Sequence, residues 1–339
     1  MINIAKRAIL KLAALAEGDQ VQTDFKRSLD EISEEELQFI RMRYSRPKFF
    51  IMGHARSGTT LLGRLVRLHP DVHCSWQMQF FSERGLIPEL LGEDVQRWLN
   101  HRSNHWSEGW DPTSTLLRVC CDQILERGAE KVDKRIVGDK SVNGNGGTAV
   151  EWAASIYPDA KLIYILRDGR DTILSKRVQQ FIDQPQYLAN KDRKILSELK
   201  ERSQDYLSEG SSIFTREWLD EAAAKWAHDV QASVEIGKER FGDQFLVVRY
   251  EDLISEAANW MARTWSFLGA GALTQGLKES IQGELERNPS AAWHESLGIE
   301  FVSELPRGMH GGWKQVFTRE DTERFHDIAG ERLKEWGYL

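Results

Sequence analysis

The sequence is poor in cysteine and has no long hydrophobic run. It holds three cysteines in 339 residues, namely Cys74 and the neighbouring Cys120 and Cys121. An odd number with two neighbours is a poor disulfide framework, so we expect free thiols in a reducing compartment and a cytoplasmic location. Neither a C-x-x-C spacing nor a histidine-rich cluster indicates a metal site. No apolar stretch approaches the roughly 18 residues needed to cross a bilayer, so a membrane-spanning protein is not expected.

Acidic residues outnumber basic ones, and proline is scarce. The net charge is -7 at pH 7, which argues against general nucleic-acid binding and leaves a local basic pocket open. Eight prolines and 26 glycines exclude a collagen-like or proline-rich architecture. Hydrophobic residues make up 41% of the sequence and charged residues 29%. This hydrophobic fraction is enough for a substantial core. The length predicts one large domain or two small ones.

Residues 1–45 differ from the rest and predict an N-terminal helical segment. The first 16 residues faintly resemble a signal peptide, but Lys11 interrupts the apolar run. Lys6, Arg7 and Lys11 share one side at helical spacing, which predicts a basic amphipathic helix. This helix either docks on the protein or makes a weak contact with a membrane surface.

From residue 46 the pattern changes to that of an α/β protein, and we expect a single domain over 46–339. Short apolar runs predict strands, and helical patterns separate them, which favours a mainly parallel sheet in a P-loop-like three-layer α/β/α arrangement. Helical insertions are expected at about 76–135 and 180–215, the second with a charged helix over 191–207. A stripe of apolar residues over 218–234 predicts core packing rather than a binding surface. The predicted strands are 49–52, 136–138, 161–166 and 245–248.

A glycine-containing loop follows the first predicted strand and precedes a helical pattern. Residues 53–60 read Gly-His-Ala-Arg-Ser-Gly-Thr-Thr, and backbone N–H groups in such a loop form an anion site. The spacing is that of a P-loop, but the phosphate lysine is missing and a cation, Arg56, stands inside the loop instead. The alternative is a tight turn with a surface arginine. The residues predicted to bind an anionic ligand here are Arg56, Ser57, Gly58, Thr59 and Thr60.

This loop, with the Leu-His-Pro-Asp-Val-His-Cys run at 68–74, resembles sulfotransferases that use 3'-phosphoadenosine 5'-phosphosulfate (PAPS). The similarity is to bacterial relatives of the tyrosylprotein and carbohydrate branch. Three further motifs in family order extend the resemblance to residue 318. By that resemblance, Arg167 and Ser175 bind the 3'-phosphate and Tyr250 lies near the adenine. The resemblance also implies that Arg307 and Gly308, in a Gly-Trp-Lys motif that closes over the nucleotide, meet the 3'-phosphate.

Each of these motifs also has a plainer interpretation. The segment around Arg167 could be a salt-bridged helix start using Asp168, Arg170 and Asp171. The two acids after Tyr250 suit any helix N-terminus.

For catalysis, the resemblance implies two cations near the transferred group, Arg56 and Lys140, with no obligatory metal. As an alternative, Asp139 and Lys140 could be an exposed charge pair. The general base is uncertain, because Trp76 and Gln77 stand where tyrosylprotein relatives carry acids, and neither can take a proton at neutral pH. The remaining candidates for the base are Glu83, His73, His101, His105 and Asp139.

The expected reaction moves a sulfuryl group from PAPS to a hydroxyl and releases adenosine 3',5'-bisphosphate (PAP). Aromatic residues in both insertions favour a small-molecule, lipid or glycan acceptor, although they could simply pack those insertions together. A kinase-like phosphotransferase and a nucleotide-binding protein without activity stay open as alternatives. The sequence carries no signal for an oligomeric state. The aromatic residues concerned are Trp76, Phe80, Phe81, Trp98, Trp106, Trp110, Phe181, Tyr187 and Tyr206.

Overall fold

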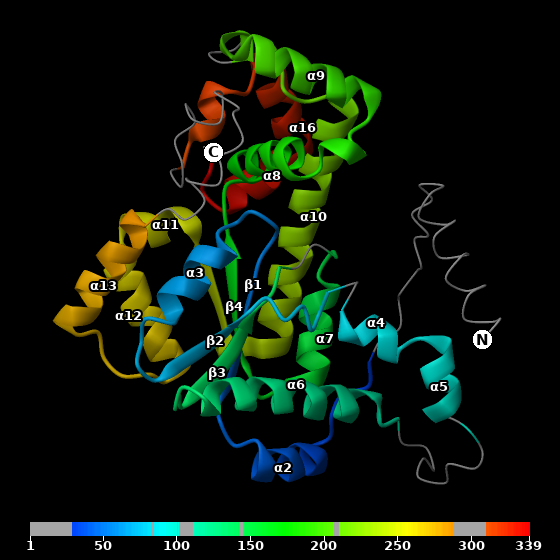
Figure 1. Ribbon diagram of the computed structural model, residues 1–339, viewed down its shortest axis with the longest axis vertical. Helices are drawn as coiled ribbons and strands as arrows, with labels where there is room; N and C mark the ends of the chain where they lie inside the picture. Colours follow the sequence, from blue (N-terminus) through cyan, green and yellow to red (C-terminus); the bar gives the residue numbers. More distant parts are fainter. Residues whose placement is uncertain are drawn as a thin grey trace.

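A five-stranded, all-parallel sheet forms the centre of the computed structural model (Figure 1). The structure describes residues 29–82, 85–99, 101, 111–142, 145–206, 210–287 and 310–339. The order across the sheet is β2-β3-β1-β4-β5, so the predicted parallel α/β architecture is confirmed. The strands are β1 (Lys48–Met52), β2 (Val72–Trp76), β3 (Ile136–Lys140), β4 (Lys161–Leu166) and β5 (Phe245–Arg249).

Four of these strands match the predicted ones and β2 does not. The strand β2 lies at one edge of the sheet, and its residues alternate between buried and partly exposed. An edge strand with alternating polar residues gives no continuous apolar run. In contrast, β1 is buried at all five positions, because helices cover both of its faces.

Helices cover both faces of the sheet (Figure 1). Phe49 and Ile51 of β1 pack against one group of helices, and Phe50 and Met52 pack against a second group on the other face. The first group is α3 (Thr59–Val66), α11 (Tyr250–Ser255), α12 (Ala257–Leu268) and α13 (Gln275–Glu286). The second is α6 (Thr113–Glu130), α7 (Thr148–Ile156) and α10 (Arg216–Phe241).

The long helix α10 carries the predicted apolar stripe, and the structure confirms it as core. Leu219, Trp226 and Val230 are buried against the sheet and its neighbouring helices. Trp218 is only partly buried and stacks on Phe214, with 5.4 Å between ring centroids. One polar residue of the same face, Asp229, is buried with the stripe.

The predicted insertions are helical. The first contains α4 (Leu86–Leu90), α5 (Glu93–Leu99) and α6, while α8 (Gly169–Asp183) runs into the second. The charged helix of the second is α9 (Asn190–Glu201), and a short 3-10 turn (Ser203–Tyr206) follows it. The helix predicted over 191–207 therefore ends early. The chain also has 3-10 turns at Pro185–Tyr187, Gly242–Gln244 and Gly312–Gln315, and the last leads into α16 (Arg319–Glu335).

Before the sheet, α2 (Glu34–Arg43) begins at a capping box in which Ser33 and Glu36 satisfy each other's backbone N–H groups. Residues 1–28, with the predicted basic helix, lie outside the described residues. No helix in the described part of the chain is long and apolar enough to cross a membrane.

Candidate functional site

The five parallel strands end on the same side of the sheet, which we call its carboxyl edge. The loop after β1 lies there between the ends of the neighbouring strands β3 and β4. Gly58 ends this loop with a φ of 96° and caps α3. A Cβ at this position would lie 2.4 Å from Cδ2 of Tyr250. The left-handed backbone and the close ring therefore both require glycine. The loop and the N-terminus of α3 together form a place where backbone N–H groups can bind an anion.

Arg56 is held inside this loop by a residue from α8. Its backbone is also left-handed, with a φ of 73°, and its Nε donates to Oγ of Ser175 over 3.0 Å. Burial and the neighbouring Arg167 lower the pKa of Arg56, although a guanidinium stays charged in proteins. The structure thus brings Arg56 and Ser175 together from 119 residues apart in the sequence.

Arg167 joins the same cluster from the end of β4. Its Nη1 donates to the backbone oxygen of Arg56 over 3.3 Å, and its guanidinium lies 4.6 Å from the ring centroid of Tyr250. Tyr250 is the first residue of α11, directly after β5. Side chains from β4 and β5 and the loop after β1 therefore converge on one place, as the predicted nucleotide site requires.

The plainer interpretation of the segment after Arg167 holds as well. Asp168 caps α8 by accepting from the backbone N–H of Arg170, and it pairs with the Arg170 guanidinium at 2.7 Å. Asp171 accepts from the backbone N–H groups of Gly311 and Trp313, at 2.7 and 3.0 Å. These bonds attach the C-terminal motif to the start of α8. Arg307 and Gly308 of that motif lie outside the described residues.

Lys140 ends β3 and is almost fully buried, with 1% of its surface exposed. Its Nζ donates to Oε1 of Gln77 over 2.7 Å and lies 3.5 Å from Oγ1 of Thr60. The ring centroid of Trp76 is 5.1 Å from the same nitrogen. Burial lowers the pKa of Lys140. The alternative of an exposed charge pair with Asp139 is wrong.

Asp139 is fully buried and is bound on both oxygens. Oδ1 accepts from the backbone N–H of Met78 over 3.1 Å, and Oδ2 accepts from Oγ of Ser141 over 2.6 Å. Burial raises the pKa of this carboxyl group. Successive side chains of a strand point to opposite faces, so Asp139 and Lys140 face opposite ways.

The structure does not bring His73 to this edge. His73 pairs in register with Val137, three residues before Lys140, and its Nε2 lies 3.0 Å from where a Cβ of Gly128 on α6 would be. Three residues along a strand span about 10 Å, which separates His73 from the carboxyl edge. His101 follows α5 in the first insertion. Glu83 and His105 lie outside the described residues.

Sequence reasoning missed a buried pair behind the loop. His54 lies 3.6 Å from Asp229 of α10, measured from Nε2 to Oδ2. Asp229 Oδ1 also accepts from the backbone N–H of Gly146, in the segment after β3, over 2.9 Å. One carboxylate therefore connects α10 to both site-bearing loops. The sequence signal for this pair is Asp229 itself, an acid in the middle of an apolar helical stripe. Acids are rarely buried without a partner, so an acid at this position indicates that a partner lies nearby.

The aromatic residues of the insertions divide into two groups. Phe80, Phe81, Phe181 and Tyr206 are buried in the core, whereas Trp76, Trp98 and Tyr187 are exposed. Trp106 and Trp110 lie outside the described residues. The alternative that these aromatics pack the insertions therefore holds for the first group and not for the second.

Two curated relatives share part of this sequence. The chain is 24% identical over 227 residues to the protein-tyrosine sulfotransferase of Drosophila melanogaster, which covers 66% of this chain and 38% of that protein. It is 28% identical over 137 residues to protein-tyrosine sulfotransferase 1 of Danio rerio, which covers 38% of this chain and 35% of that protein. The matched part thus spans little more than a third of each relative.

Among solved structures, a mouse sulfotransferase, SULT7A1, complexed with PAP is similar with a TM-score of 0.46 and 16% identity, over 89% of this chain and 90% of that chain. A model of the sulfotransferase family matches residues 47–272, which is more than half of the sequence. That match spans the loop after β1, Lys140, Arg167, Ser175 and Tyr250. The chain belongs to the sulfotransferase family.

Proposed function

We propose that the protein transfers the sulfuryl group of PAPS to a hydroxyl of a small-molecule, lipid or glycan acceptor. The observation that carries this proposal is the convergence of Arg56, Arg167, Ser175 and Tyr250 beside the phosphate loop. With Lys140 at the neighbouring strand end, this edge offers three cations to an anionic ligand. PAPS is such a ligand, because it carries negative charge on its 5'-phosphosulfate and on its 3'-phosphate.

The residues divide between binding and chemistry. The loop N–H groups, Ser57, Thr59 and Thr60 suit the 5'-phosphosulfate, while Arg167 and Ser175 suit the 3'-phosphate. Tyr250, held against Gly58, provides a flat ring for the adenine. PAPS supplies the activated sulfuryl group, and the task of the protein is to position both substrates and to stabilise charge.

In the transfer, the acceptor oxygen forms a bond to sulfur while the bond between sulfur and the 5'-phosphate oxygen breaks. The electron pair of the broken bond stays on PAP, and the proton of the acceptor hydroxyl passes to a base. Lys140 and Arg56 stabilise the charge that develops on the leaving phosphate oxygen. Glu83, His101, His105 and Asp139 remain the candidates for the base, and Asp139 would need to exchange one of its two present hydrogen bonds.

The cofactor assignment is tested by comparing how strongly PAP and AMP stabilise the protein in the absence of metal. We expect PAP at about 100 times its dissociation constant to stabilise the fold by roughly 2.7 kcal/mol in the presence of EDTA, with a smaller shift for AMP. Arg167→Ala should lose this preference for PAP. Arg97→Ala is the control for that variant, because Arg97 is an exposed arginine on α5. Equal stabilisation of the fold by AMP and PAP would contradict the proposed 3'-phosphate site. If PAP binds but radiolabelled PAPS labels no alcohol, the protein binds the nucleotide without transferring the group.

A further inference from the structure

Four uncharged residues at the end of β2 lie next to Lys140. They are residues 76–79, Trp-Gln-Met-Gln, which begin with the last residue of β2, and we refer to them as the 76–79 turn. Gln77 and Gln79 both have left-handed backbones, with φ of 55° and 58°. Non-glycine residues rarely adopt this conformation, and it costs on the order of 1–3 kcal/mol each unless the surroundings impose it.

Two buried residues at the end of β3 hold this turn by hydrogen bonds. Asp139 accepts from the backbone N–H of Met78, and Lys140 donates to the side-chain oxygen of Gln77. Because these side chains face opposite ways, they hold the turn at two separate points. Beyond the turn, the buried Phe80 and Phe81 anchor the chain in the core. The shape of the turn is therefore fixed before any ligand arrives.

The fixed turn exposes apolar surface instead of burying it. Trp76 is 49% exposed and Met78 is 40% exposed, although both are large apolar side chains. The Trp76 ring nevertheless lies close to the buried Lys140 amine. An exposed aromatic ring next to a buried cation, on a strained and clamped turn, has the features of a binding surface.

The strand order decides which substrate this surface faces. The groups assigned to the nucleotide stand on the loop after β1 and at the ends of β4 and β5, all on one side of Lys140 on β3. The 76–79 turn follows β2, on the other side of Lys140. A second substrate that meets the nucleotide at Lys140 therefore approaches over this turn.

We propose that the 76–79 turn binds the acceptor, and that the acceptor is an uncharged alcohol with a flat apolar ring. The ring packs on Trp76 and Met78, which directs its hydroxyl toward Lys140. The turn itself offers no charge to an acidic peptide or a polyanionic glycan. This inference rests on the proposed function, since it assigns the substrate class of that same site.

The test compares a flat apolar alcohol, 2-naphthol, with a sugar, methyl glucoside, in the full-length protein. We expect 2-naphthol to be the better acceptor, and we expect Trp76→Ala to raise its KM about tenfold with little change in the affinity for PAP. Trp76→Phe keeps a flat ring and should retain most of the affinity, whereas Trp76→Leu should not. Phe39→Ala is the matched control, because this phenylalanine is 69% exposed on α2, before the amino end of β1.

Binding of 2-naphthol to the PAP-loaded protein, measured by calorimetry, separates this inference from the proposed function because it needs no turnover. Loss of that binding in Trp76→Ala supports the inference even if no sulfuryl transfer is seen. Unchanged binding in Trp76→Ala overturns the inference, as does a preference for methyl glucoside. An equal loss in Phe39→Ala overturns it too, since the effect would then not depend on the turn.

Discussion

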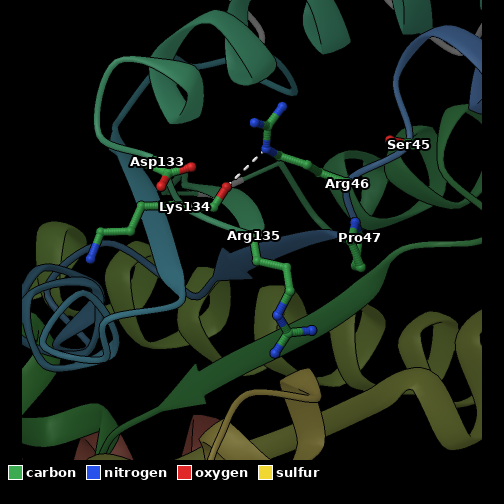
Figure 2. A pocket seen from close by; sticks show the side chains of 6 residues that line it. All are labelled: Ser45, Arg46, Pro47, Asp133, Lys134 and Arg135. Carbon is green, nitrogen blue, oxygen red and sulfur yellow. Dashed lines mark hydrogen bonds between the residues drawn. The ribbon is translucent and has the colours of Figure 1, made fainter.

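Both ends of the central sheet gather cations, but the cations have different partners. At the amino end, Lys48 Nζ lies 2.8 Å from Glu126 Oε1 of α6, and Arg46 pairs with the same carboxylate. The hollow at this end is lined by Arg46, Lys134 and Arg135 (Figure 2). Arg46 Nε donates there to the backbone oxygen of Lys134, and Arg135 pairs with Asp71 at 2.9 Å.

At the carboxyl end, Arg56 bonds to a hydroxyl and Lys140 to an amide. Among the described residues, neither forms an ion pair within 4.0 Å. Burial lowers the pKa of both side chains. For Glu126, burial raises the pKa, but the hydrogen bonds from Lys48 and Arg46 outweigh it and hold the pKa below its ordinary value. Cations with carboxylate partners therefore stabilise the fold, and we propose that Arg56 and Lys140, with neutral partners, serve the ligand.

The largest expected effect is on stability, from Glu126→Gln at the amino end. The change removes the carboxylate from a buried ion pair and leaves Lys48 without it, which costs about 3–5 kcal/mol. Urea unfolding measures the loss, with Glu93→Gln as the control because the Glu93 side chain is 94% exposed. The affinity of the folded protein for PAP should not change.

The pH dependence of unfolding adds a check on the same variant. Because folding lowers the pKa of Glu126 from its ordinary 4.5, its stabilising contribution is complete above that value. The contribution is then lost as the pH falls through the folded pKa. Glu126→Gln should therefore lose less stability than the native protein over that acidic range. Parallel pH profiles would contradict the role given to the amino-end pair.

The next effect is on turnover, from Lys140→Met at the carboxyl end. Methionine keeps an apolar stem next to Gly63, where the Lys140 side chain now packs, but it removes the charge. We expect kcat to fall by about 10²–10³-fold, with little change in PAP affinity and a smaller loss of stability than in Glu126→Gln. The same substitution at the amino end, Lys134→Met, is the control. A stable Lys140→Met variant with normal kcat would remove the distinction between the two ends.

The sequence predicted the parts of the carboxyl edge that depend on local patterns. Buried apolar strands and a glycine loop with Arg56 inside it are visible in short windows, whereas the family resemblance singled out Lys140 and Arg167 at the predicted strand ends. The edge strand β2 was missed because its alternation with polar residues gives no apolar run. The bond between Arg56 and Ser175 joins residues 119 apart, and spacing alone cannot place such a contact.

Other features depend on which face of the sheet a side chain occupies. Asp139 and Lys140 are neighbours in sequence, yet one is held by Met78 and Ser141 and the other by Gln77. The left-handed backbones of Gln77 and Gln79 have no sequence signature, because glutamine does not favour that conformation. The buried Asp229 behind the loop becomes meaningful only once the helix α10 is placed against β4 and β5, where it reaches His54.

The smallest expected effect is that of Ser175→Ala, which tests whether the carboxyl-end serine serves the ligand or only Arg56. Losing one neutral hydroxyl should weaken PAP binding by about 0.5–1.5 kcal/mol, which is roughly two- to thirteenfold. If Ser175 contacts the 3'-phosphate, calorimetry should find weaker binding of PAP and unchanged binding of AMP. If it only orients Arg56, both ligands should weaken, and Ser175→Ala should add nothing to Arg56→Ala. Ser280→Ala on the exposed face of α13 is the control. A carboxylate partner at the amino end would give a far larger loss of stability and none of this ligand dependence, so the ligand dependence is what separates the two ends of the sheet.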